Sequence, residues 1–227
     1  MYERTGASRA ERLTLAAVAA LCAASAGWLL LGGGLEVVGG WLGRTWKPGE
    51  FLRRICLAAA LAVYFIRVLF TVFVFLKRAV TWSEVFTIAP WLLCLYLLVA
   101  ISGGRNGGSL GAAGIAGGVL FILGSWTNSF AEYARHQWKL RPENRGRLYT
   151  GGLFRHSRHP NYLGDLLSFS GLCLIAGKWV TVAIPLFMLA GFVFVNIPAL
   201  DAHLSQKYGS QFDQYAARSW KLIPFVY

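Results

Sequence analysis

Long uninterrupted runs of apolar residues dominate the first half of the chain and predict membrane-spanning helices. Four such runs cover residues 13–31, 55–76, 85–102 and 110–130. A helix that crosses the hydrocarbon core of a bilayer needs about 20 mostly apolar residues, so each run is long enough for one span. We therefore expect four spanning helices before the chain turns polar near residue 131.

Two further apolar segments, residues 163–177 and 179–200, predict a helical hairpin in the last third of the chain. Only Lys178 joins them, after the helix breaker Gly177, and the first arm is short for a full span. The tail, residues 201–227, is polar with aromatic residues at intervals, which predicts a short amphipathic helix. The expected fold class is thus an all-α integral membrane bundle of about six transmembrane segments with a C-terminal helical hairpin.

The first apolar run follows Arg4, Arg9 and Arg12, so it has two interpretations. A basic start followed by an apolar core is typical of a cleaved signal peptide. The core of such a peptide is usually shorter than this run, which has the length of a span. We expect the run to be the first transmembrane helix.

Composition supports the membrane assignment and limits the partners. Hydrophobic residues make up 56% of the 227 residues, and the formal charge is +12, from 22 basic and 10 acidic side chains. The basic residues flank apolar segments rather than forming a soluble domain, so we expect no nucleic-acid partner. Basic loops favour the cytoplasmic side of a membrane, which places the chain start, the second loop, the basic stretch and the tail there. The connector with Arg44, Lys47, Arg53 and Arg54 fits the outer side poorly.

Several isolated residues have plausible but weak chemical roles. Cys22, Cys56, Cys94 and Cys173 all lie in apolar runs without metal-site spacing, so we expect no metal, disulfide or catalytic thiol. Arg67 lies near the middle of a span, where a charge normally faces a cavity or a partner. It either binds a polar ligand, or it pairs with an acid such as Glu84, or its side chain extends to the membrane surface.

The most informative segment is the basic stretch that follows the fourth run. Seven Lys and Arg residues lie between residues 135 and 158, interrupted by glycine, asparagine and proline. Such residues favour a folded, turning loop. A folded loop with several guanidinium groups suits a polyanionic ligand, although basic groups beside a membrane can also hold anionic lipid headgroups. We favour the ligand.

Two motifs in the last third resemble a known group of membrane enzymes. The string RHPNYLGD at residues 158–165 opens the hairpin, and the tail carries KYG at 207–209, Phe212, Tyr215 and IPFVY at 223–227. Both are similar to the signature of the superfamily of sterol C14 and C7 reductases, steroid 5-alpha-reductases and isoprenylcysteine carboxyl methyltransferases. Residues 137–154 are most similar to a bacterial branch known only as steroid-reductase-like. The resemblance covers roughly the last 95 residues.

The resemblance implies two domains and a cofactor pocket facing the cytoplasm. Residues 1–131 would form the transmembrane substrate side and residues 132–227 the cofactor-binding region. The reductases use NADPH, and the methyltransferases use S-adenosylmethionine. Asn161 and Asp165 in the motif, and Asp201 with His203 in place of a glutamate pair after the last span, favour the reductases. The implied cofactor-binding residues are Lys139, Arg141, Arg145, Arg155, Arg158, His159, Asn161, Tyr162, Asp165, Tyr208 and Tyr215. Among them, the basic side chains could neutralise the phosphates of NADPH.

The expected function is NADPH-dependent reduction of a carbon–carbon double bond in an apolar, steroid- or isoprenoid-like substrate that enters from the bilayer. The protein would sit in a bacterial inner membrane, and the sequence does not indicate its oligomeric state. The catalytic proton donor is unknown, with Glu84, Tyr149 and Tyr162 as weak candidates beside Tyr64 and Tyr96. A carboxyl or lipid methyltransferase that uses S-adenosylmethionine is the alternative. A non-catalytic lipid-binding membrane protein is the third possibility.

Overall fold

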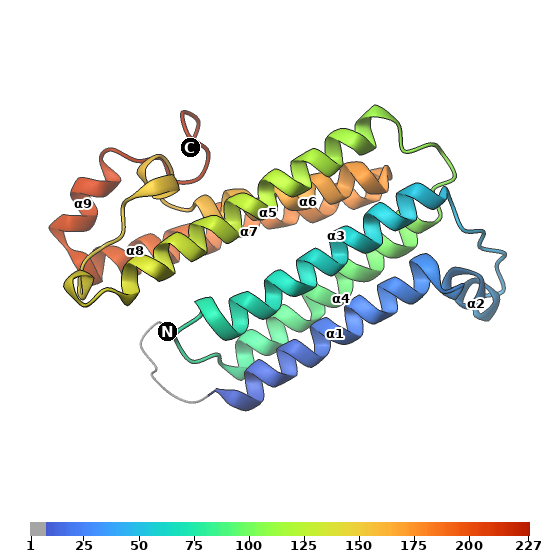
Figure 1. Cartoon of the computed structure of the whole chain (residues 1–227), viewed down its shortest axis with the longest axis horizontal. Coiled ribbons are helices and arrows are strands. Elements are labelled where there is room, and N and C mark those ends of the chain that lie inside the picture. Colours follow the sequence, from blue (N-terminus) through green and yellow to red (C-terminus); the bar gives the residue numbers. More distant parts are fainter. Residues whose placement is uncertain (1–7) are drawn as a thin grey trace. The chain divides into compact units, whose positions relative to one another are not determined.

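The computed structural model describes residues 8–227, and every regular element among these residues is a helix (Figure 1). The possible signal peptide begins outside the described residues. The α-helices are α1 (Arg9–Leu31), α2 (Gly34–Trp41), α3 (Phe51–Phe70), α4 (Trp82–Gly104), α5 (Gly111–Leu140), α6 (Pro160–Ala176), α7 (Ala183–Gly191), α8 (Ile197–Tyr208) and α9 (Ser210–Ala216). Short 3₁₀ helices occur at Pro142–Asn144, Gly152–Arg155 and Trp179–Val182, and π-helices occur at Thr71–Phe75 and Phe192–Asn196.

Within residues 8–227, five helical stretches are long and apolar enough to cross a membrane. They are Arg9–Leu31, Phe51–Phe75, Trp82–Gly104, Gly111–Leu140 and Trp179–Tyr208. The prediction of an all-α integral membrane protein is thus confirmed. The remaining expected segment, residues 163–177, corresponds to α6, whose 17 residues extend only about 25 Å at 1.5 Å per residue.

One predicted boundary was wrong. The fourth apolar run was expected to end near residue 130 and the folded basic loop to begin at Arg135, but α5 continues through Arg135 and Lys139 to Leu140. The segment 131–140 contains no proline or glycine, so nothing in it stops a helix. The helix ends just before Arg141, because Pro142 disfavours helical backbone in the residue that precedes it.

The described chain forms two compact units. The first unit comprises residues up to Phe121 together with Ser170–Ile184, and the second comprises Ile122–Phe169 and Pro185–Tyr227. Helices α5 and α6 therefore each contribute residues to both units. The sequence suggests a functional division at residue 131, between a substrate side and a cofactor-binding region. The two compact units do not test this division, which stays a prediction.

Helices α1, α3 and α4 lie side by side in the first unit (Figure 1). Leu15, Ala19, Cys22 and Ala26 of α1 recur at intervals of three or four residues and are buried, as expected for one face of a helix. Leucine and small residues on this face let the helices approach closely. The buried face of α1 is therefore apolar from Leu15 to Ala26.

Two arginines of the first unit, Arg53 and Arg54, donate to backbone carbonyls near helix ends. Arg53 is buried and donates to the carbonyl oxygens of Ile175, Gly108 and Ser109, and Arg54 donates to Leu30 O at 2.8 Å. The last carbonyls of a helix have no partner within the helix, so a guanidinium at its end supplies donors and opposes the dipole. These contacts give the two arginines a structural role in a connector whose positive charge fits the outer side of the membrane poorly.

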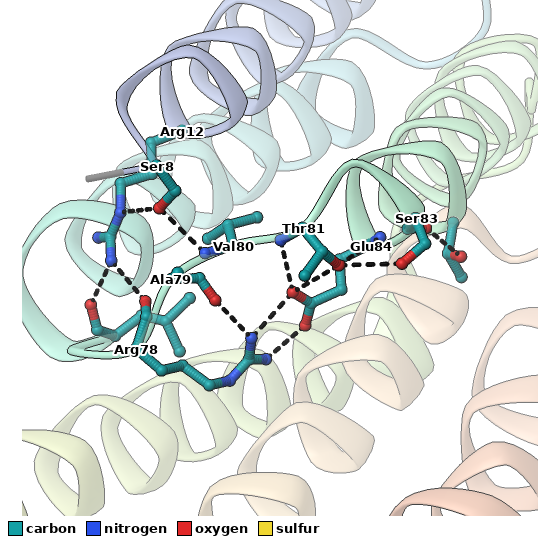
Figure 2. A network of polar contacts seen from close by, with 10 residues as sticks. Ser8, Arg12, Arg78, Ala79, Val80, Thr81, Ser83 and Glu84 are labelled. Carbon is teal, nitrogen blue, oxygen red and sulfur yellow. Dashed lines mark hydrogen bonds and ion pairs between the residues drawn. The ribbon is translucent and has the colours of Figure 1, made fainter. Parts of the chain in front are cut away.

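Arg12 serves the other end of the same unit in the same way (Figure 2). Its guanidinium donates to the carbonyl oxygens of Val72, Leu76 and Arg78 beyond the end of α3. Its Nε donates to Ser8 Oγ, which in turn accepts from Val80 N. The start of α1 is thereby fixed to the loop between α3 and α4.

Glu84 completes this network at the start of α4 (Figure 2). Thr81 is the N-cap of the helix, and Glu84 three residues later accepts from Thr81 N at 2.9 Å, which forms a capping box. The same carboxylate receives both terminal nitrogens of Arg78, one of them at 2.8 Å. Glu84 thus pairs with Arg78, and the Cζ of Arg67 lies 5.9 Å from the ring centre of Tyr64.

Helices α5 and α6 approach through glycines spaced seven residues apart on each helix. In the second unit a Cβ added at Gly124 would lie 2.5 Å from Gly164 O. In the first unit a Cβ added at Gly171 would lie 2.5 Å from Gly117 O. Real Cβ atoms do not approach so closely, so a side chain at any of these positions would force the helices apart. Gly177 then ends α6 in a left-handed conformation (φ 62°) that L side chains rarely adopt.

Candidate functional site

The RHPNYLGD motif lies where the chain enters α6, and the tail of the protein is hydrogen-bonded to it. Arg158 N donates to Trp220 O at 2.7 Å, and Trp220 N donates to His156 O at 3.2 Å. Ser157 Oγ donates to Leu222 O at 2.8 Å and accepts from His159 N. The two regions that carry the sequence resemblance, separated by 41 residues (166–206), therefore form one structure in the second unit.

Asp201 of α8 joins the first two residues of the motif. Its Oδ2 lies 3.3 Å from Arg158 Nη2, and its Oδ1 lies 2.9 Å from His159 Nε2. The Arg158 and His159 side chains are 8% and 1% exposed, and that of Asp201 is 17% exposed. An ionised carboxylate only accepts, so the imidazole carries a proton on Nε2. The three residues form a nearly buried polar cluster with fixed orientation.

An aromatic stack continues from this cluster into the core. The rings of His159 and Tyr162 are 5.3 Å apart with an interplanar angle of 10°, and those of Tyr162 and Phe192 are 4.4 Å apart at 5°. Phe192, Ile197 and Leu222 form a buried apolar cluster around which Tyr162 also packs. The stack therefore holds the ring of Tyr162 against α8 and the tail.

A second polar cluster lies on the other flank of the motif. Asn161 Nδ2 donates to Glu132 Oε1 at 3.0 Å, while Arg135 Nη2 contacts Glu132 Oε2 at 2.5 Å. Asn128 Nδ2 donates to the carbonyl oxygen of Asn161. Glu132 is buried although it carries a charge, and both of its oxygens have a partner. The start of α6 is thereby fixed to the end of α5.

Tyr215 of α9 binds the backbone just before the motif. Its hydroxyl donates to Phe154 O at 2.7 Å, and the ring is buried. Burial disfavours the phenolate and so raises the pKa of Tyr215 above its ordinary value. The phenol therefore stays protonated at physiological pH and acts as a fixed hydrogen-bond donor.

A cavity of about 510 Å³ opens beside this tyrosine. Its lining side chains come from the loop before the motif, from α9 and from the segment after α9, and they are Thr150, Arg155, His156, Tyr215 and Arg218. Three of these residues, Arg155, His156 and Arg218, are exposed to solvent. None of the lining residues is an acid, so the cavity presents donors and positive charge.

The remaining predicted cofactor residues belong neither to the Asp201 cluster nor to the lining of the cavity. Lys139 lies in the last turn of α5, and Arg141 and Arg145 lie in the exposed loop that follows. Arg135, Lys139 and Lys207 are close enough for their charges to interact, and Tyr208 also lies near Arg135. Asp165 is half-buried in the second turn of α6. The structure brings Arg158, His159 and Tyr162 together, and it places Arg155 and Tyr215 at one cavity.

The three candidate proton donors have different surroundings. Glu84 belongs to the capping network at the start of α4 in the first unit. This structural role explains the contacts of its carboxylate without a catalytic role. Tyr149 packs between Trp138 and Phe154, with ring centres 5.3 and 5.4 Å away. Tyr162 stands in the aromatic stack.

Sequence reasoning missed three residues of this region: Asp201, Glu132 and Arg218. Asp201 attracted notice only as a departure from the methyltransferase pattern, and its contacts connect residues 42 and 43 positions apart. Glu132 and Arg218 lack any local motif. Among residues 8–227, no group of three or more potential ligands could hold a metal ion.

Comparison with known proteins identifies the family. The family described as "Protein of unknown function (DUF1295)" matches residues 69–219, about two thirds of the chain. The chain belongs to the DUF1295 family. The matched segment begins in α3 and ends beyond α9, so it contains both the motif and most of the tail.

Curated relatives of this DUF1295 protein include both reductases and methyltransferases. A probable O-methyltransferase of Ustilaginoidea virens is 36% identical over 92 residues, covering 40% of this chain and 32% of that protein. The 3-oxo-5-alpha-steroid 4-dehydrogenase 2 of Homo sapiens is 30% identical over 108 residues, covering 48% and 41%. The Delta(14)-sterol reductase of Schizosaccharomyces pombe is 36% identical over 85 residues, covering 36% and 20%.

These relatives confirm the superfamily that the motifs suggested. The DUF1295 chain spans between a fifth and two fifths of the length of the three relatives. They include enzymes of two reaction types, so the similarity alone does not assign one of them to this chain.

Proposed function

We propose that the protein is a membrane-embedded, NADPH-dependent reductase of a carbon–carbon double bond in an apolar steroid- or isoprenoid-like substrate. The observation that supports this proposal best is the basic cavity lined by Arg155, His156 and Arg218. Guanidinium groups bind phosphate esters through paired, charge-assisted hydrogen bonds. NADPH carries a pyrophosphate and a 2′-phosphate, whereas S-adenosylmethionine has no phosphate and bears a sulfonium cation.

The donors present fit such a cofactor. The cavity offers two guanidinium groups, an imidazole and the hydroxyl of Thr150, and its volume lies within the roughly 300–1,000 Å³ typical of ligand sites. Within the described residues, Nε of Arg158 is buried without a hydrogen-bond partner, so one donor beside Asp201 is left over. We expect Arg155 and Arg218 to contact phosphate.

The other predicted residues would extend the site. Lys139, Arg141 and Arg145 would add positive charge near the cofactor. Asn161, Tyr162, Asp165 and Tyr208 would contact its uncharged parts.

The chain's own contribution is binding, orientation and proton supply. A bound reduced nicotinamide supplies the hydride. The Asp201 cluster would keep Arg158, His159 and the adjacent stack in one orientation, as precise positioning of a cofactor requires. Tyr149 and Tyr162 remain candidates for the proton donor, and Glu84 is less suited because both of its oxygens are engaged.

An S-adenosylmethionine-dependent methyltransferase acting on a carboxyl group or a lipid is the second candidate. The similarity to a probable O-methyltransferase favours it, since that relative is 36% identical in the aligned region. A cavity lined by arginines is a poor environment for a sulfonium cation, and we therefore rank this function below the reductase.

The test is calorimetric titration of the purified full chain in detergent with NADPH, NADH and S-adenosylmethionine. We expect NADPH to bind in preference to the others, with an affinity that salt weakens. Arg155→Gln and Arg218→Gln should each weaken NADPH binding by about tenfold or more, the loss typical of a charged hydrogen bond. Arg147→Gln is the matched control, because it removes the same charge from an exposed position of the same loop outside the cavity.

Three outcomes would contradict the proposal. Preferential binding of S-adenosylmethionine would assign the protein to the methyltransferases. Equal losses in Arg155→Gln and Arg147→Gln would show that the cavity is not the phosphate site. Binding of none of the three compounds would favour the non-catalytic, lipid-binding alternative.

A further inference from the structure

A second basic cavity lies in the first unit. It measures about 280 Å³ and is lined by Ile101, Ser102, Arg105, Lys178, Trp179 and Val180. The residues come from the end of α4 and from the turn that follows α6. Helix α4 begins at the Glu84 network and ends at this cavity, so the two features occupy opposite ends of the helix.

The residues that line the cavity are those expected at the boundary between the apolar and polar layers of a membrane. Its apolar residues belong to candidate spans, since one span ends at Gly104 and another begins at Trp179. Its charged residues, Arg105 and Lys178, lie just outside these spans. Trp179 is 86% exposed, and tryptophan is enriched at the level of lipid headgroups.

Arg105 is held in place before any ligand binds. Its guanidinium carbon lies 4.3 Å from the ring centre of Trp46, a cation–π contact. The loop that carries Trp46 is in turn fixed to the end of α4, because Gly49 N donates to Gly104 O at 2.7 Å. A pre-oriented guanidinium loses less conformational entropy on binding than a free one.

From this combination we propose that the cavity binds the phosphate of an anionic glycerophospholipid headgroup. Arg105, Lys178 and the hydroxyl of Ser102 would contact the phosphate, and Ile101 and Val180 would face the glycerol and the start of the acyl chains. A soluble phosphate compound offers the same oxygens but would gain nothing from the apolar side of the cavity. The site is independent of the proposed reductase, since none of its lining residues is among those proposed to bind the cofactor.

The experiment counts bound lipid on the intact protein. The full chain in mild detergent is mixed with phosphatidylglycerol or with phosphatidylcholine of the same acyl chains, and retained lipid is measured by native mass spectrometry. We expect preferential retention of phosphatidylglycerol. The variant R105Q/K178Q should bind it about thirtyfold more weakly, since each basic group near an anionic surface contributes roughly a factor of five.

The variant R44Q/K47Q is the matched control. It removes the same two charges from the loop that is fixed to the end of α4, at exposed positions outside the cavity. Its phosphatidylglycerol binding should equal that of the unmodified protein. Equal losses in both variants would indicate diffuse surface charge and overturn the proposal, as would equal retention of the two lipids.

A competition experiment distinguishes a lipid phosphate from a soluble phosphate compound as the ligand of the cavity. Millimolar inorganic phosphate should leave the bound lipid in place, because it lacks the acyl chains that contact the bilayer side. Complete displacement would assign the cavity to a soluble phosphate compound and overturn the lipid assignment. NADPH titration of R105Q/K178Q should match the unmodified protein, so failure here is distinguishable from failure of the reductase proposal.

Discussion

Asp201 is the residue on which the geometry of the motif depends most. It is the counter-charge of Arg158 and the hydrogen-bond acceptor of His159, and both partners are almost inaccessible to water. A charge left alone in such surroundings is far more costly than one at the surface. The carboxylate therefore stabilises the site through charge as well as through hydrogen bonding.

Substitution Asp201→Asn should lower stability by about 3 kcal/mol, because it leaves the buried guanidinium of Arg158 without its counter-charge. The expected observation is a Tm lowered by several degrees in detergent. Asp213→Asn is the control, since it removes the same charge from an exposed position in α9. Equal Tm values for the two variants would show that the buried ion pair contributes little.

Because of Tyr215, the free energy of unfolding should fall as the pH rises into the alkaline range. Burial raises its pKa, so the folded protein holds the phenolic proton more tightly than the unfolded chain does. Its contribution is therefore constant below the unfolded value of about 10 and falls as the pH rises above it. Tyr215→Phe should cost about 1 kcal/mol at neutral pH, through loss of the hydrogen bond to Phe154 O.

The same variant should lose less stability than the unmodified protein between pH 9 and 11. Thermal unfolding across this pH range measures the difference. Parallel pH profiles would mean that Tyr215 does not titrate differently on folding.

At the scale of helices, the contact of α5 with α6 depends on glycines. Gly117 and Gly124 on one helix, and Gly164 and Gly171 on the other, each leave a gap that a neighbouring backbone fills. Small residues with this kind of spacing are typical of helix pairs in membranes, where close backbone approach supplies much of the association energy. Since α6 begins with the motif, this contact also positions the site.

Gly124→Ala should destabilise the protein by about 1–3 kcal/mol, because the added Cβ would lie 2.5 Å from Gly164 O and Ser168 N. Gly118→Ala, on the same helix, is the control. A Cβ at Gly118 meets nothing within 4 Å, and alanine is the better helix former by up to about 1 kcal/mol. Opposite shifts in Tm are expected, and a decrease of equal size in both variants would contradict the packing argument.

For the whole molecule, the sequence was sufficient to predict the features that depend on local residue patterns. Runs of apolar residues predicted the spans, because a membrane imposes length and hydropathy on each helix separately. The motif and the tail predicted the region of interest. Contacts such as Arg53 to Ile175 O, or His159 to Asp201, join residues far apart in the chain. Their identity follows only from three-dimensional packing, and no pattern in the sequence announces them.

The number of membrane crossings is open to a direct test. If α6 crosses despite its 17 residues, the loop with Arg145 and the turn with Lys178 lie on opposite sides of the membrane. If the basic loop also faces the cytoplasm, as the sequence predicts, Arg145→Cys should resist and Lys178→Cys should accept a membrane-impermeant maleimide in intact cells. Labelling of both positions from outside would mean that α6 returns to the side on which it started.

The π-helical turn Phe192–Asn196 determines the direction in which Asp201 points. A π-turn is an α-helix with one additional residue inserted, and each residue of an α-helix advances the rotation by about 100°. Deleting one exposed residue of this turn, such as Val195, would convert it to regular helix without shortening the apolar span appreciably. Everything after it would rotate by about that angle, and the carboxylate would face away from His159. An insertion or deletion at this point is thus a means of disconnecting the motif while every side chain of the motif stays unchanged.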